Sequence, residues 1–120
     1  MTSPRSYLDY LDDILDAIEK TEQFVLGLTY EEFRRDDKTV FAVIRALEIV
    51  GEATKQIPQP VRTGHSEIPW REMAGMRDKL IHDYLGVNLL VVWRTATEDM
   101  PALRPMLKAM LDEGETSSDT

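Results

Sequence analysis

The chain has 120 residues, 42% of them hydrophobic, and a formal net charge of −8. This length allows one domain and leaves little room for a second. The acidic balance argues against a protein that coats nucleic acid through a broad basic surface. The absence of cysteine excludes disulfides and thiolate metal sites.

The first half of the chain predicts two long amphipathic helices, at residues 5–26 and 38–56, in which apolar residues recur at steps of three, four and seven. Gly27 ends the first helix, and a short helical turn follows with Thr29 as its capping residue. Pro58 and Pro60 end the second long helix.

The second half of the chain begins with a predicted loop at residues 58–68. A third helix is expected from Pro69 to about residue 84, because proline is well tolerated in the first helical turn. Asn88 suits the N-cap of a last helical stretch over residues 89–111, which Pro101 and Pro105 should bend or break.

These elements predict an all-α fold, an antiparallel four- to five-helix bundle over residues 1–111. Residues 112–120 hold four acidic residues and no basic one, a composition typical of a disordered tail. No apolar run approaches the roughly 18–20 residues that span a bilayer, and residues 1–5 do not begin a signal peptide. We therefore expect a cytoplasmic protein without membrane contact.

Positive charge gathers in the middle of the chain. Within residues 62–82 lie Arg62, Arg71, Arg77 and Lys79, against Glu67, Glu72 and Asp78. Residues 1–37, in contrast, carry ten acidic residues and four basic ones. An anionic substrate is therefore expected at the middle segment and not along the first helix.

Arg77 interrupts the apolar pattern of the predicted third helix, at a position where helical spacing calls for a hydrophobic residue. An inward-facing guanidinium is costly unless it is paired or lines a solvated cleft. A structural interpretation is that Arg77 pairs with Glu48 or Glu52 of the second helix and fixes the packing register. A functional interpretation is that it binds a substrate.

His82 lies five residues beyond Arg77, roughly 140° around an ideal helix, so the two side chains flank one cleft only near the helix end. A histidine in this place is also compatible with a surface or packing role. The role of Tyr84 is also open. It can be a half-buried tyrosine that closes the end of the helix, or it can be a functional residue.

Residues 76–84, MRDKLIHDY, resemble the motif of HEPN toxins of the HepT group, in which arginine, four residues, histidine, one residue and tyrosine follow one another. The resemblance extends to residues 45–53, RALEIVGEA, to Trp70, and to residues 91–93 and 98–101. It thus covers most of residues 5–111 and implies a HEPN-like helical bundle.

HEPN toxins of this group are metal-independent RNA endonucleases, usually paired with a minimal nucleotidyltransferase antitoxin. The resemblance implies that Arg77 and His82 are catalytic, and that Tyr84 is the residue to which the antitoxin attaches AMP. The substrate would then be RNA, with transfer RNA as a candidate.

The residues are compatible with that chemistry without any metal or cofactor. The 2′-hydroxyl of RNA can act as nucleophile, so the protein has to move protons and stabilise charge on the phosphate. His82 suits proton transfer because an imidazole ordinarily titrates near neutral pH, and the planar Arg77 side chain can donate two hydrogen bonds to a phosphate. Asp78, Glu52 and Glu48 are expected to orient these two side chains.

Cleavage needs a base on one side of the phosphate and an acid on the other, whereas one chain offers a single histidine in this motif. A two-fold homodimer would bring two such motifs into one cleft. Two alternatives remain open: a non-catalytic helical module that binds nucleotides or a nucleotidyltransferase, and an antitoxin that neutralises an enzymatic partner.

Overall fold

The computed structural model describes residues 6–78 and 88–118. The helical elements are α1 (Tyr7–Val25), α2 (Tyr30–Arg34), α3 (Asp37–Lys55), α4 (Gln59–Gly64), α5 (Trp70–Ala74), α7 (Leu89–Arg94), the π-helical turn η1 (Thr95–Asp99) and α8 (Met100–Ser118). These ranges contain no strand, so the predicted all-α fold is confirmed, while the number of helices in the bundle stays a prediction. No helix in the described ranges is long and apolar enough to cross a membrane.

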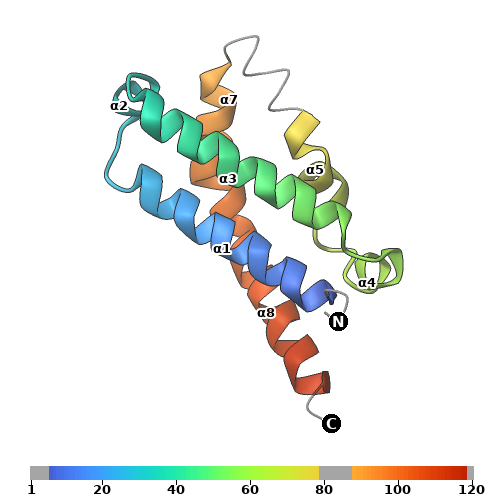
Figure 1. The fold of residues 1–120 in the computed structure, drawn as a ribbon. Coiled ribbons are helices and arrows are strands. Elements are labelled where there is room, and N and C mark those ends of the chain that lie inside the picture. Colours follow the sequence, from blue (N-terminus) through green and yellow to red (C-terminus); the bar gives the residue numbers. More distant parts are fainter. Residues whose placement is uncertain (1–5, 79–87, 119–120) are drawn as a thin grey trace, which may run out of the picture.

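Helices α1 and α3 lie side by side and antiparallel (Figure 1). In the continuous stretch α7–η1–α8, η1 and α8 pack against α1, and α7 packs against α2. The short α5 packs against α3. The core between these helices includes Leu11, Ile14, Leu47 and Leu107, none of which is exposed to solvent. Burial of such side chains contributes about 1.5–3 kcal/mol each, so the apolar faces of the helices determine their arrangement.

Short-range signals set the helix starts as the sequence predicts. The Thr29 side chain accepts a hydrogen bond from the Glu32 amide, and Glu32 accepts one from the Thr29 amide, so α2 begins with a complete capping box. Asn88 caps α7 by accepting from the Val91 amide. Gly27 has a φ of 77°, a left-handed conformation that glycine adopts without strain, immediately after α1.

The predicted loop at residues 58–68 is partly wrong, because it contains the helix α4 (Gln59–Gly64). Pro60 lies in the first turn of α4, where the missing amide proton breaks no helical hydrogen bond. Pro60, which was predicted to end the preceding helix, is therefore also compatible with the start of a new one.

The predicted third helix is interrupted. α5 ends at Ala74, Gly75 forms a turn, and residues 76–78 are helical again. Glycine weakens a helix by about 1 kcal/mol relative to alanine, which allows the break at this position. The rest of this predicted helix, including Lys79 and the expected C-terminal end near residue 84, lies outside the described residues.

Pro101 and Pro105 do not break the last helical stretch. The wider π-helical turn η1 ends at Asp99, two residues before Pro101, and Pro105 lies inside α8. Pro101 has no amide proton to donate, so one helical hydrogen bond is missing there. The wider turn accommodates this loss without ending the helix. α8 continues to Ser118, past its expected end at residue 111. The division into a domain of residues 1–111 and a tail of 112–120 stays a prediction.

Candidate active site

One face of α3 presents a basic residue followed by two acidic residues at helical spacing. Nη1 of Arg45 lies 3.7 Å from a carboxylate oxygen of Glu48 and 3.8 Å from Oε1 of Glu52. The three residues follow one another by three and four positions, which places them on one ridge of the helix. Glu48 and Glu52, the two predicted partners of Arg77, therefore both lie on this ridge.

Arg77 joins this face from the segment that follows α5. Its Nη1 lies 3.8 Å from the same Oε1 of Glu52 that contacts Arg45. The carboxylate of Glu52 therefore stands between two guanidinium groups, one from each segment. Of the two predicted partners of Arg77, the structure brings Glu52 to it, while Glu48 contacts Arg45.

The expectation that Arg77 faces inward is wrong. Its side chain is 48% exposed, and its partner Glu52 is 42% exposed. Met73 and Met76 are buried instead, because the turn at Gly75 shifts the helical phase and turns Met76 toward the core. Arg77 is thus a half-exposed cation at the edge of the core, which is the position a phosphate can reach.

Gly51 allows the segment of Arg77 to approach α3 closely. A Cβ at position 51 would lie 3.1 Å from the backbone nitrogen of Arg77 and 3.4 Å from the carbonyl oxygen of Met73. Both contacts are to backbone, which cannot rotate away as a side chain does. The glycine next to Glu52 therefore determines how near Arg77 comes to that carboxylate.

The contact between Arg77 and Glu52 orients the arginine without a hydrogen bond. A distance of 3.8 Å is within reach of electrostatic attraction but too long for an N–H···O bond. A guanidinium carries five N–H donors, and this ion pair engages none of them in a hydrogen bond. Electrostatic attraction to Glu52 can orient Arg77 and leave its N–H donors available for hydrogen bonds to a phosphate.

The other predicted site residues are only partly described. Asp78 is exposed and follows Arg77 in the helical segment 76–78, so it lies beside the candidate site. His82 and Tyr84 lie outside the described residues, and their predicted roles as catalytic residue and modification site stay predictions. Among the residues that are described, no group of three or more histidine, aspartate or glutamate side chains is placed to hold a metal ion.

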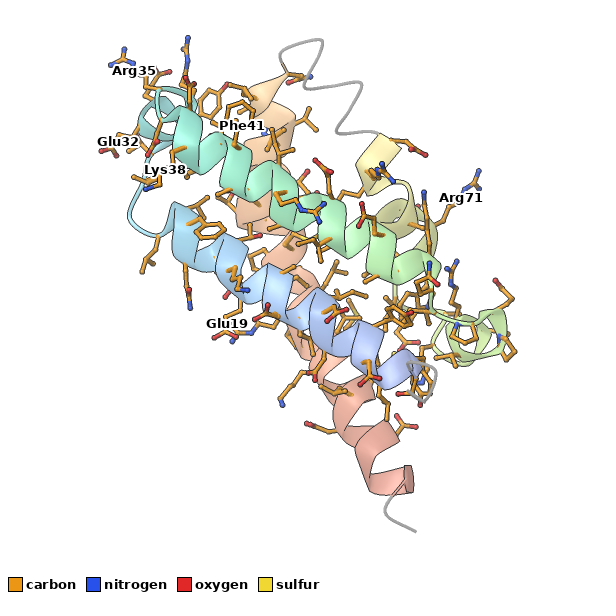
Figure 2. All side chains as sticks on the ribbon, viewed as in Figure 1. Glu19, Glu32, Arg35, Lys38, Phe41 and Arg71 are labelled. Carbon is orange, nitrogen blue, oxygen red and sulfur yellow. The ribbon has the colours of Figure 1, made fainter. Side chains whose placement is uncertain are left out.

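The basic residues of the middle segment divide into structural and exposed ones. Arg62 donates hydrogen bonds from Nε to the Ile57 carbonyl at 3.0 Å and from Nη2 to the Thr54 carbonyl at 2.7 Å. It therefore closes the C-terminal end of α3. Arg71, in contrast, extends away from α5 (Figure 2). Arg45 also belongs to the candidate site through its contact with Glu52, although it was not among the predicted site residues.

Residues 14–110 match the family described as HepT-like, ribonuclease HepT-like. The chain belongs to the HepT-like ribonuclease family. The match contains α3 and the segment of Arg77, the two parts that form the candidate site.

Curated relatives cover almost the whole chain. A protein of Thermococcus cleftensis named "Probable ribonuclease HepT" is 58% identical over 83% of this chain and 91% of its own length. A "Putative RNase" of Caldanaerobacter subterraneus subsp. tengcongensis is 42% identical, covering 94% of this chain and 98% of its own. Another "Putative RNase", from Methanocaldococcus jannaschii, is 41% identical over 88% of each chain. No solved structure matches the sequence.

Proposed function

We propose that this protein is the toxin of a toxin–antitoxin pair, a metal-independent endoribonuclease whose catalytic residues are Arg77 and His82. Membership of the HepT-like ribonuclease family supports ribonuclease activity. The observation that carries the assignment of the site is the half-exposed Arg77, whose guanidinium lies 3.8 Å from the Glu52 carboxylate of α3. A buried structural arginine would not offer its donors to a phosphate.

The proposed reaction uses the 2′-hydroxyl of the RNA as nucleophile. It attacks the adjacent phosphorus, the bond from phosphorus to the 5′-oxygen breaks, and the products carry a 2′,3′-cyclic phosphate and a 5′-hydroxyl. One imidazole takes the proton of the 2′-hydroxyl and another gives a proton to the leaving oxygen. Arg77 stabilises the charge that develops on the phosphate oxygens.

This proton balance requires two histidines in opposite roles, so the proposal includes a homodimer in which His82 of each protomer faces one cleft. Light scattering on the purified protein should then give a mass twice that of the 13.8 kDa chain. A monomer that cleaves RNA at full rate would contradict the two-histidine arrangement.

Neutralisation by a minimal nucleotidyltransferase antitoxin is the second part of the proposal. Transfer of AMP to the Tyr84 hydroxyl would add bulk and a negative phosphate, which would block the cleft and repel RNA. The toxin would act in the cytoplasm, where its substrate, with transfer RNA as a candidate, is found.

The deciding experiment incubates the purified protein with total RNA and with transfer RNA in EDTA. The wild type should cut RNA in the chelator, and the variants Arg77→Ala and His82→Ala should not. Glu19→Gln, on the outer face of α1 (Figure 2), serves as the matched control and should cut like the wild type.

Loss of cleavage in EDTA, restored by a divalent cation, would contradict the metal-independent mechanism. Equal cleavage by the wild type and His82→Ala would remove histidine from the reaction. If the wild type cuts no RNA and its expression does not arrest growth, the non-catalytic binding module or the antitoxin becomes the better description.

A further inference from the structure

A hollow of about 410 Å³ lies between α1 and α3, directly beside the candidate site. It is lined by Tyr10, Asp13, Ile49, Glu52, Ala53 and Gln56. The two residues from α1 are three positions apart, and the three from α3 and its C-cap Gln56 follow at three, one and three, so each set occupies one face of its helix. The volume is within the range of small-ligand pockets.

Glu52 connects this hollow to Arg77. Its carboxylate lines the hollow and also lies 3.8 Å from Nη1 of Arg77. A ligand in the hollow therefore contacts the same side chain that orients the proposed phosphate-binding arginine. In an RNA strand, the group next to a bound phosphate is a nucleoside, so this is where a neighbouring base would be placed.

The lining groups select the chemistry of the ligand. Asp13 and Glu52 are carboxylates, and none of the lining residues in the described part of the chain is a lysine or arginine, so these groups disfavour a phosphate. Within residues 6–78 and 88–118, the two carboxylates are not part of a group of three or more side chains that could hold a metal ion. Tyr10 and Ile49 add an aromatic ring and an apolar side chain, and the Gln56 amide can both donate and accept hydrogen bonds.

A nucleobase has the properties that these groups require. Single-stranded RNA is recognised through bases that stack on aromatic side chains and hydrogen-bond along their Watson–Crick edges. A carboxylate accepts hydrogen bonds only, so it favours a base edge rich in N–H donors. Guanine presents two neighbouring donors, N1–H and the 2-amino group, whereas uracil presents a single donor between two acceptors.

We propose that this hollow binds the base adjacent to the scissile phosphate and prefers guanine, with Asp13 and Gln56 as specificity-determining residues. The inference rests on the proposed ribonuclease function, because it assigns a base subsite to the same cleavage site. Asp13 accepts from the donor edge of the base, and Gln56 binds its remaining polar groups. Glu52 then links base binding to the position of Arg77.

The test compares cleavage of short RNAs that carry guanosine or inosine at the position next to the cut. Inosine lacks the 2-amino group but is otherwise the same base. A hydrogen bond to a charged group contributes about 1.5–3 kcal/mol, so the wild type should cut the inosine RNA about tenfold more slowly or worse. In Asp13→Asn the difference between guanosine and inosine should largely disappear.

Asp12→Asn is the matched control, because Asp12 is the exposed neighbour of Asp13 on α1 and does not line the hollow. It should retain the wild-type preference for guanosine. Circular dichroism should show the same helix content in both variants. Gln56→Ala provides a second substitution from the other helix and should also weaken the preference.

Three outcomes are decisive. If the wild type cuts RNA but treats guanosine and inosine alike, or if Asp13→Asn keeps the full preference, the base subsite is wrong while the ribonuclease proposal stands. If Asp13→Asn changes the mass of the dimer instead of the base preference, the hollow receives a basic side chain of a protein partner, which also overturns it. If the wild type cuts nothing and binds 2′-O-methyl RNAs with guanosine and inosine equally, both proposals fail.

Discussion

Gly51 of α3 and Arg77 approach so closely that a single methyl group would not fit between them without movement. A Cβ at position 51 would be 3.1 Å from the Arg77 backbone nitrogen and 3.5 Å from its Cβ. The smallest residue of α3 and the proposed phosphate-binding residue are therefore in direct contact. Their proximity couples the packing of the bundle to the geometry of the site.

Gly51→Ala should destabilise the protein by about 1–3 kcal/mol and reduce RNA cleavage, because the added methyl group pushes the Arg77 segment away from Glu52. Chemical denaturation measures the first effect, and cleavage in EDTA the second. Gly64→Ala is the matched control, since a Cβ there meets no atom within 4 Å. It should leave cleavage unchanged and the stability equal or slightly higher. Equal behaviour of the two variants would contradict the close approach.

Glu52→Gln should separate activity from stability. The ion pair between Glu52 and Arg77 is half exposed on both sides, so its loss should cost no more than about 1 kcal/mol. RNA cleavage should fall by up to about fivefold, the factor that corresponds to about 1 kcal/mol, because the neutral amide no longer attracts the guanidinium into position. The ratio of kcat/KM for Glu52→Gln and wild type measures the effect on activity. The difference between their unfolding free energies measures the effect on stability. Wild-type cleavage by Glu52→Gln would exclude an orienting role for this carboxylate.

The start of α3 should be sensitive to acid. The Asp36 carboxylate accepts hydrogen bonds from the Thr39 hydroxyl at 2.7 Å and from the Thr39 amide at 3.2 Å. These bonds, the one from the hydroxyl first, lower the pKa of Asp36 from its ordinary value of 3.8. A lowered pKa in the folded state means that the stabilisation is complete above the ordinary value and is lost as the pH falls through the folded value.

Thermal unfolding followed through this acidic range should therefore show a steeper loss of Tm for the wild type than for Asp36→Asn. Asparagine still caps the helix but does not titrate there. Asp36→Ala should lower Tm near neutral pH, since it removes the cap. Parallel curves for the wild type and Asp36→Asn would show that this carboxylate does not contribute to the acid sensitivity.

The contact between α1 and α8 should depend on apolar burial far more than on charge. Leu107 is fully buried, and Leu107→Ala should cost about 2–5 kcal/mol. Arg104 forms an ion pair with Glu22 at 2.7 Å, but its side chain is 48% exposed, so Arg104→Ala should cost no more than about 1 kcal/mol. Added salt should diminish the loss of stability in Arg104→Ala and leave the loss in Leu107→Ala unchanged. Denaturant titrations at low and high salt measure both.

Local signals explain how much of the fold could be predicted from the sequence. The long helices α1 and α3 begin and end within about two residues of their expected bounds, because apolar spacing and Gly27 act over a few residues. The predicted caps at Thr29 and Asn88 are confirmed for the same reason, because capping is also a local interaction. The helix α4 was missed because Pro58 and Pro60 indicate the end of one helix and the start of another equally well.

The sequence by itself determined the helical class, the family resemblance and the choice of Arg77 and Glu52, since these depend on residue types and their spacing along the chain. Only the tertiary structure decided that Arg77 is half exposed, that Glu52 lies between Arg45 and Arg77, and that Tyr10 and Gln56 line one hollow. The physical reason is that helical periodicity is a local property. The direction of a side chain after the turn at Gly75, and the partners that it meets, depend on how separate helices pack.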